Sequence, residues 1–238
     1  MKITYLNHSG MLLQTDKAAI VIDYYSNGMN KSTQQLLQNA LSAHTRVYVL
    51  ISHAHGDHYD QDALNFKGKD GVEPTFIFSF DAEKKKHHKG THFLQSGQTY
   101  TDDLLHCKAY GSTDEGISFY LEFGGKQLFH AGDLNNWHWK AEVDAQEADG
   151  YQTAYLKELD IIKADISHLD ALMFPVDPRL AVDYDIGAIQ FASAIRVDTL
   201  LPMHFGNDFA AIQAVAGQLA PLVGKYVVWQ SMGESVEV

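Results

Sequence analysis

Four residues that could bind a metal lie within six consecutive positions. The segment HAHGDH carries His53, His55, Asp57 and His58 directly after the apolar run VYVLIS. Alternate side chains of an extended chain point to the same side, so His53 and His55 can face one centre. The glycine that follows permits a tight turn, which lets Asp57 and His58 approach that centre from another direction. Imidazole nitrogens and carboxylate oxygens are ligands of zinc and neighbouring divalent metals, so the spacing predicts a metal site.

Two later segments repeat this layout. FHAGD ends an apolar run with Asp133 at a glycine-assisted turn, where a carboxylate could bridge two cations. LPMHFG ends another apolar run with His204. Each candidate ligand therefore follows the C-terminal end of a predicted strand, and rigid strand ends that converge on one point are what a metal site requires.

The elements that must position these residues follow from the hydrophobic pattern. Short apolar runs bounded by turn residues predict strands over residues 3–8, 11–15, 19–25, 47–52, 75–80, 92–97, 104–110, 117–123, 126–133, 171–176, 199–204 and 225–230. Helical spacing predicts helices over residues 32–44, 151–165, 187–196 and 208–220, with Ser32 as the cap of the first. Strands and helices in both halves predict two sheets between helices.

Three polar stretches are harder to assign. Asp57 and His58 are expected in the first turn of a helix that continues through residues 61–66. The acidic, aperiodic stretch at residues 140–150 is expected to be a surface loop or an insertion near the site. The basic stretch KKKHHK at residues 84–89 is expected to be a solvated turn.

Composition limits the function classes. The chain has 238 residues, of which 45% are hydrophobic, enough for one domain over residues 1–238. A formal net charge of −12 repels phosphate backbones and anionic lipids, which makes nucleic acid a disfavoured partner. No basic and apolar signal opens the chain, and no stretch reaches the ~18 apolar residues of a membrane span, so a cytoplasmic protein is expected. Cys107, the single cysteine, is expected to be a buried apolar residue.

These segments together resemble the metallo-β-lactamase superfamily, in particular its lactonase-like or UlaG-like branch. The HxHxDH hallmark of that family matches residues 53–58, and its later motifs match at Asp133 in AGD and His204 in PMH. The resemblance covers almost the whole chain. It implies an α+β fold, a four-layer αββα sandwich with a metal cleft at the edge of both sheets.

The resemblance also implies how the ligands divide between two metals. One metal would be held by His53, His55 and Asp133. The other would be held by Asp57, His58, His204 and the shared Asp133.

One ligand of the family pattern is absent. The family usually offers a histidine in a GHT-like turn between HxHxDH and AGD, and here Ser112 stands at that position in AYGSTDEG. A serine hydroxyl is a poorer zinc ligand than an imidazole, so the first site is expected to be weakened or completed by another group. Asp114, Glu115, His8 and His138 are the candidates that the sequence leaves open.

Other polar residues fall near the predicted strand ends. His8 lies in a segment similar to the GHSS-type opening of lactonase-like members, and could face the substrate, support a ligand or simply end a strand. Asp23 resembles the family's buried aspartate that orients a ligand histidine. The segment DLNNWHW, which includes His138, is expected in part to line the cleft or else to pack on the core. Arg179, beside Asp177, could clamp a carboxylate or phosphate or form a surface salt bridge.

The expected function is hydrolysis by metal-bound hydroxide. A divalent cation lowers the pKa of its water to about 7 and polarises the oxygen under attack. Zn²⁺ is the first expectation, with Mn²⁺ or Fe²⁺ as alternatives and one or two ions bound. Asp57 would hold the hydroxide and pass its proton to the leaving group of a small-molecule ester, lactone or phosphodiester. The alternative is a metal-binding regulatory or scaffolding module that has lost turnover because Ser112 replaces a ligand. Either protein could form an oligomer, and neither needs a membrane.

Overall fold

Two seven-stranded sheets form the centre of the molecule. The computed structural model describes residues 1–238 and gives the strand orders β14-β1-β2-β3-β4-β5-β6 and β13-β12-β11-β10-β9-β8-β7. The strands of the first sheet are β14 (Ser235–Glu237), β1 (Lys2–Asn7), β2 (Gly10–Gln14), β3 (Ala19–Ile22), β4 (Val47–Ile51), β5 (Thr75–Ser79) and β6 (His92–Leu94). The strands of the second sheet are β13 (Lys225–Tyr226), β12 (Arg196–Met203), β11 (His168–Pro175), β10 (Lys126–His130), β9 (Ser118–Phe123), β8 (Leu105–Tyr110) and β7 (Thr99–Thr101).

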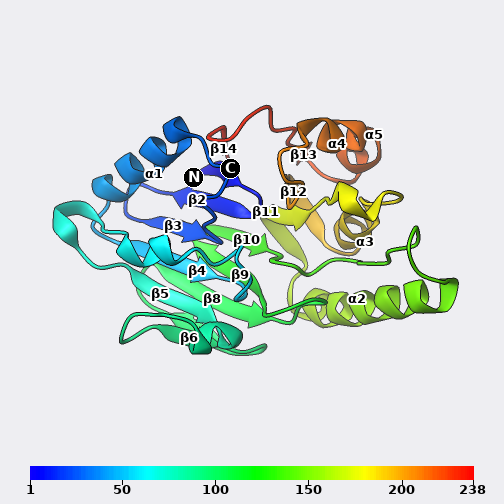
Figure 1. The fold of residues 1–238 in the computed structure, drawn as a ribbon, viewed down its shortest axis with the longest axis horizontal. Helices are drawn as coiled ribbons and strands as arrows, with labels where there is room; N and C mark the ends of the chain where they lie inside the picture. Colours follow the sequence, from blue (N-terminus) through cyan, green and yellow to red (C-terminus); the bar gives the residue numbers. More distant parts are fainter.

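Helices cover the outer faces of the two sheets. They are α1 (Lys31–Ala43), α2 (Ala145–Asp165), α3 (Ile186–Ala194), α4 (Phe209–Ala214) and α5 (Ala216–Leu219). Helix α1 lies on the side of the first sheet, and the other four lie on the side of the second (Figure 1). This arrangement confirms the expected four-layer αββα sandwich of the α+β class. None of the helices combines the length and apolar character that crossing a bilayer would require.

The first sheet is buried on both faces because its side chains alternate between two apolar layers. In β4, Tyr48 and Leu50 join the large core between the sheets, whereas Val47, Val49 and Ile51 join a smaller core under α1. Successive residues of a strand point to opposite faces, so a strand buried on both sides is apolar throughout. This explains the unbroken apolar run VYVLI.

Parallel strands bring the predicted site segments to one edge. Strand β4 is parallel to β3 and β5, and β10, β11 and β12 are parallel neighbours in the second sheet. Parallel strands share the edge at which their carboxyl ends lie. The residues that follow β3, β4, β10, β11 and β12 therefore meet at the same end of the sandwich.

The starts of two helices differ from the sequence predictions. Asn30, not Ser32, caps α1, because its Oδ1 accepts the Thr33 N–H at 2.8 Å. The predicted loop at residues 140–150 is wrong in its second half, since α2 begins at Ala145. Asp144 caps that helix by accepting the Glu147 N–H at 3.0 Å, so the acidic residues form its first turn.

Two predicted helices are interrupted and three strands differ. Residues 56–58 form a turn that is separate from the 3₁₀ helix Gln61–Asn65, which Asp60 caps. The predicted helix over 208–220 divides at Val215 into α4 and α5. The predicted strand over 225–230 pairs only at Lys225–Tyr226, and the short strands β7 and β14 have too few residues for a pattern to reveal them.

Candidate metal centre

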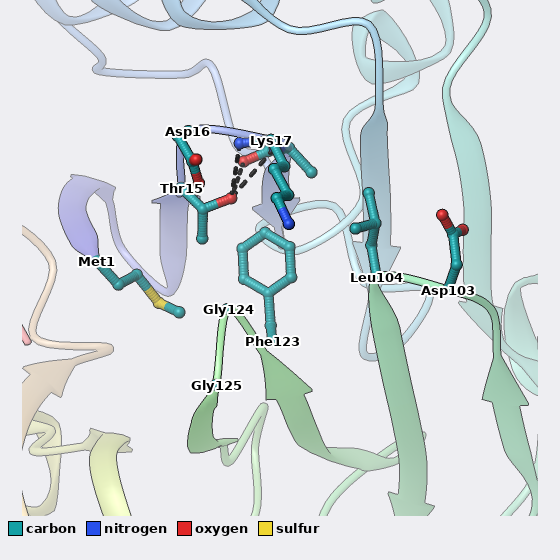
Figure 2. A pocket seen from close by; sticks show the side chains of 10 residues that line it. Met1, Thr15, Asp16, Lys17, Asp103, Leu104, Phe123, Gly124 and Gly125 are labelled. Atoms are coloured by element: carbon teal, nitrogen blue, oxygen red, sulfur yellow. Dashed lines mark hydrogen bonds between the residues drawn. The ribbon is translucent and has the colours of Figure 1, made fainter.

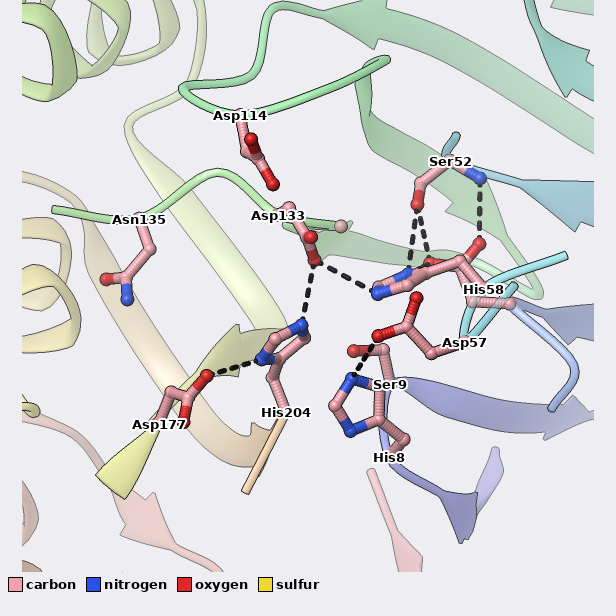
Figure 3. A network of polar contacts seen from close by, with 12 residues as sticks. His8, Ser9, Ser52, Asp57, His58, Asp114, Asp133, Asn135, Asp177 and His204 are labelled. Carbon is pink, nitrogen blue, oxygen red and sulfur yellow. Dashed lines mark hydrogen bonds and ion pairs between the residues drawn. The ribbon is translucent and has the colours of Figure 1, made fainter. Parts of the chain in front are cut away.

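The predicted ligands converge on Asp133. Its Oδ1 lies 3.1 Å from His58 Nε2 and 3.2 Å from His204 Nε2, and its Oδ2 lies 3.4 Å from His53 Nε2 (Figure 3). His53 and His58 follow β4 of the first sheet. Asp133 follows β10 and His204 follows β12, both in the second sheet. All of them are buried, with Asp133 only 4% exposed. The three distant strand ends thus meet as the sequence predicts.

A buried aspartate orients the histidines that follow β4. Asp23, directly after β3, accepts the Nδ1–H of His58 at 2.8 Å. Its other oxygen accepts the backbone N–H of Ser52 at 2.7 Å, and the Ser52 hydroxyl donates to Asp23 at 2.6 Å. His53 Nδ1 lies 3.1 Å from the same hydroxyl oxygen, to which it can donate. These bonds leave the Nε2 atoms of both histidines directed at Asp133, the arrangement that metal-bound imidazoles need.

Asp177 does the same for His204. It lies just after β11, and its Oδ2 accepts the Nδ1–H of His204 at 2.9 Å. Arg179 donates from Nε to Asp177 at 2.8 Å, while its side chain stays 60% exposed. From the sequence, Arg179 could form either a salt bridge or a contact with the substrate. The structure shows its salt bridge with Asp177. The hydrogen bond that Asp177 accepts from His204 is not predicted by the sequence.

Several buried polar atoms at this centre make no hydrogen bond and have only ion-pair contacts with one another or with Asp57. They are Nε2 of His8, His53, His58 and His204, and Oδ1 of Asp133. More than nine in ten buried polar groups in folded proteins are hydrogen-bonded, so such a cluster needs an explanation. Imidazole nitrogens and a carboxylate oxygen facing one space are the donor set of a divalent cation. The residues present therefore fit the metal that the fold family implies.

His55 and Asp57 occupy the open side of the centre. His55 is exposed, and the side chain of Asp57 is 39% exposed. The nearest potential ligand atoms of His53, His55 and Asp57 lie within 4.8 Å of one another. The predicted ligand with catalytic duty, Asp57, is thus placed where solvent and substrate can reach it.

His8 lies as close to the candidate ligands as they lie to one another. Its ligand atom groups with those of Asp57, His58 and His204, all within 4.8 Å. Its Nε2 is 3.4 Å from Asp57 Oδ2, and its ring centroid is 4.0 Å from that of His204. The backbone of this segment also joins the two sheets. His204 N–H donates to His8 O at 3.0 Å, and His130 Nε2 lies 2.9 Å from Ser9 O, to which it can donate.

The charges at the centre depend on each other. Burial raises the pKa of Asp133, but the imidazoles of His204 and His58 outweigh burial and hold that pKa well below its usual range. Burial lowers the pKa of His58, yet Asp133 and Asp23 together raise it to about 10. His53, with burial and His58 against its charged form, has its pKa lowered to about 4. Contact with His8 lowers the pKa of Asp57, so this carboxylate is ionised at neutral pH.

Three site residues adopt left-handed backbone conformations. These are His8 (φ 53°), Asp23 (φ 48°) and His204 (φ 62°), each directly after a strand. Residues other than glycine rarely adopt such backbone angles, and those that do cluster at functional sites. The backbone therefore bends sharply where each side chain turns towards the candidate ligands.

Of the four candidates to replace the missing histidine, only Asp114 lies with ligands of the first site. The ligand atoms of Asp114, His55 and Asp133 lie within 4.8 Å of one another, and Figure 3 shows the Asp114 side chain pointing towards Asp133. Burial and the charge of Asp133 raise the pKa of Asp114. Glu115 belongs to no such group, and His8 lies with the ligands of the second metal.

His138 and Ser112 are directed elsewhere. His138 is fully buried, with Nε2 near Asp183 O at 3.3 Å and Nδ1 accepting the Lys140 N–H at 3.1 Å. The histidine of the segment DLNNWHW is thus buried away from the candidate ligands, which argues against a role for His138 at the metal. The Ser112 hydroxyl accepts the Asp114 N–H at 3.3 Å and takes no place among the potential ligands.

An open pocket of about 540 Å³ lies at the other end of the sandwich (Figure 2). It is formed by the turn between β2 and β3, by the turn between β9 and β10, and by Met1. None of the residues lining it is a histidine, and none has a buried polar atom without a partner. The chemistry of the chain is therefore concentrated at the edge that carries Asp133.

Comparison with known families agrees with this geometry. Residues 2–150 match the family model of the beta-lactamase superfamily domain. A UPF0173 metal-dependent hydrolase of Thermus thermophilus is 31% identical over 225 residues, which are 90% of this chain and 87% of the relative. Another from Carboxydothermus hydrogenoformans is 24% identical over 231 residues, with 92% and 90% covered. The chain belongs to the beta-lactamase superfamily, as the motifs predict.

The fold has close counterparts among solved structures. Igni18, described as a novel metallo hydrolase from Ignicoccus hospitalis, superposes with a TM-score of 0.69 at 22% identity, covering 99% of this chain and 97% of that one. At that identity the likeness concerns the fold alone. The family match and the metal-dependent hydrolase of Thermus thermophilus, not this likeness, identify the chain as a metal-dependent hydrolase of the metallo-β-lactamase superfamily.

Proposed function

We propose that the chain hydrolyses a small ester, lactone or phosphodiester with the help of one or two divalent cations, zinc before manganese or iron. The observation that supports this most is the set of buried, unpartnered nitrogens around Asp133. Asp23 and Asp177 orient two of these rings, those of His58 and His204. When bound, a divalent cation would supply a nucleophile at neutral pH and polarise the oxygen under attack.

The residues divide into holding and reacting groups. His53, His55 and Asp133 would hold the first cation, and Asp57, His58, His204 and the same Asp133 the second. His8 adds an imidazole beside Asp57 that keeps this carboxylate ionised. In this ionised form Asp57 would accept a proton at Oδ2 from the attacking water and deliver it to the oxygen of the leaving group as the ester bond breaks.

Arg179 favours a substrate that carries a negative group. Its guanidinium is held by Asp177 through Nε and Nη2, and no hydrogen bond engages Nη1. Its Nη2 lies 3.3 Å from Nδ1 of His204, so it stands one ring away from the candidate metals. A planar cation at this distance suits a carboxylate or phosphate that is attached to the scissile group.

Metal analysis with a hydrolysis panel tests the proposal. The protein would be stripped with a chelator, reloaded with zinc, manganese or iron, and assayed on carboxylic esters, lactones and phosphodiesters. We expect reloading to restore turnover, and Asp57→Asn to lower kcat by about 10²- to 10⁴-fold. His87→Gln is the control, because that exposed histidine bonds only to Lys85 O and should change nothing.

Two outcomes would contradict the proposal. Metal held without hydrolysis of any panel member would instead favour a regulatory or scaffolding module. Failure of the folded protein to retain any metal would remove the basis of both readings.

A further inference from the structure

The turn between β8 and β9 carries the feature that the proposed function leaves unexplained. Ser112 stands where a histidine would complete the first metal site, yet its hydroxyl caps its own turn by accepting the Asp114 N–H. Two residues further along, Asp114 has its carboxylate within 4.8 Å of the ligand atoms of His55 and Asp133. No hydrogen bond or salt bridge engages that carboxylate.

This turn is tied to both segments that carry the first-site ligands. Thr113 Oγ1 donates to Asn135 O at 2.6 Å and accepts the Asn135 N–H at 3.0 Å, two residues after Asp133. At the other end of the turn, Ile117 N–H donates to Ser52 O at 2.9 Å. The position of Asp114 is therefore determined by contacts on both sides of it.

Gly116 allows the turn to lie this close to β4. Its φ is +71°, and a Cβ atom there would lie 2.1 Å from Ser52 O and 2.4 Å from His53 Cβ. No other residue type fits such a position without a backbone shift. The backbone of residues 112–116 is therefore held in a conformation that places the Asp114 carboxylate beside His55 and Asp133.

Two carboxylates at this spacing favour a cation between them. Asp114 and Asp133 repel each other when both are ionised, and only the imidazoles on the far side of Asp133 offset its charge. His55, the third member of the group, is exposed and offers a ring nitrogen. A divalent ion would relieve the repulsion and use all three side chains.

We propose that Asp114 is the missing ligand of the first site, and that it makes this site richer in oxygen than one completed by a histidine and more exchangeable than the second site. The inference rests on the proposed metal-dependent function. With His53, His55, Asp114 and Asp133, the first site would have two nitrogen and two carboxylate donors. Replacing an imidazole by a carboxylate shifts preference from zinc towards harder ions such as Mn²⁺. Exposure of His55 and Asp114 gives the ion a short path to solvent.

Titration of the metal-free protein tests this without measuring activity. Zn²⁺ and Mn²⁺ would be added separately, and binding followed by calorimetry and, for Mn²⁺, by electron paramagnetic resonance. We expect wild type to bind two ions with unequal affinity. Asp114→Asn should weaken the looser site by about 10- to 100-fold and leave the tighter one unchanged. Asp114→His should tighten Zn²⁺ and weaken Mn²⁺ at the looser site.

Glu115→Gln is the matched control, since it removes the same charge from the neighbouring residue, which belongs to no ligand group. If Asp114→Asn binds both ions as wild type does, or if Glu115→Gln weakens them equally, the assignment of Asp114 is wrong while the hydrolase proposal stands. If wild type binds no metal at all, the hydrolase proposal fails with it.

Discussion

At the scale of single residues, the centre depends on carboxylates that touch imidazoles rather than metals. Asp23 and Asp177 each accept an Nδ1–H and so direct the Nε2 of His58 and His204 inward. Burial raises the pKa of Asp177, but the bonds from His204 and Arg179 lower it to about 2, so it acts as an anion throughout the neutral range.

Removing the charge of Asp177 should loosen the metal without unfolding the protein. We expect Asp177→Asn to weaken metal binding by about 10- to 100-fold, because the His204 ring loses its preferred tautomer. The control is Asp198→Asn, which breaks a similar pair with His168 at 2.9 Å on the surface. Equal affinity in the two variants, measured by titration with Zn²⁺, would show that Asp177 does not orient a ligand.

Metal binding should release protons. In the metal-free protein, burial lowers the pKa of His58, but Asp133 and Asp23 raise it to about 10. Burial also lowers the pKa of His204, but Asp133 and Asp177 raise it to about 9. Both rings are therefore protonated at pH 7, and a cation must displace about two protons to reach Nε2. Affinity should rise with pH until these groups have lost their protons. Calorimetry in buffers of different ionisation enthalpy measures the release, and an enthalpy independent of buffer would contradict it.

The same raised pKa values stabilise the metal-free fold at low and neutral pH. A group whose pKa is higher in the folded state contributes stability below its unfolded pKa, near 6.5 for histidine, and loses it as pH rises through the folded value. For His58 and His204 that loss falls between about pH 6.5 and 10. The metal-free protein should therefore become easier to unfold with urea across this interval, whereas a bound metal would reverse the trend.

At the scale of elements, short turns after the strands determine the site geometry. Gly132, between β10 and Asp133, has φ +55°, and a Cβ there would lie 2.8 Å from Ser52 Cβ and 2.9 Å from Ile117 O. The strand end that delivers Asp133 is thus pressed against the strand end that delivers His53. A change at Gly132 should disturb stability and metal binding together.

Substitution of two glycines separates these effects. Gly125→Ala, in the turn between β9 and β10, meets no atom within 4 Å but has φ +76°, so it should cost about 1–2 kcal/mol from backbone strain alone. Gly132→Ala adds overpacking, for about 1–3 kcal/mol more, and should lower metal affinity as well. Urea unfolding and metal titration of both variants check this, and equal results for the two would show that the close approach at Gly132 is unimportant.

The sequence predicts elements well where burial alone decides them. Apolar runs such as VYVLI are buried on both faces, so their pattern is strong, and the candidate ligands that follow them at residues 53–58, 133 and 204 lie close together, as the spacing predicts. The start of α2 was missed because Gly150 and the acidic residues near it have weak helical preference, which the Asp144 cap and tertiary packing overcome. Asp114 and Asp177 sit in turns whose course depends on distant residues such as Asn135 and His204. No local pattern could select them.

At the scale of the whole molecule, one core joins the two sheets. Side chains from β1–β5 and from β8–β12 belong to the same buried cluster, and α2 and α3 pack on its outer side. We therefore propose that residues 1–238 form one domain. Cys107 on β8 lies fully buried in that cluster, as its apolar surroundings in the sequence predict.

Cys107 should therefore report on opening of the sandwich. Burial raises the pKa of its thiol well above the usual range, and thiolate is the reactive form. We expect no reaction with a thiol reagent in native buffer at pH 8 and one thiol per chain after unfolding in denaturant. Rapid labelling of the native protein would mean that the sheets separate far more readily than this packing implies.

The backbone of residues 8 and 9 has a consequence for substrate selection. It joins the two sheets beside the candidate ligands, through His204 N–H to His8 O and His130 to Ser9 O. Separating the sheets at this end would break both bonds at once, so the strand ends that carry the ligands keep a fixed spacing. We expect differences in substrate range among relatives to arise from the turns that carry Asp114 and Arg179, which can vary in length and sequence while that spacing is kept.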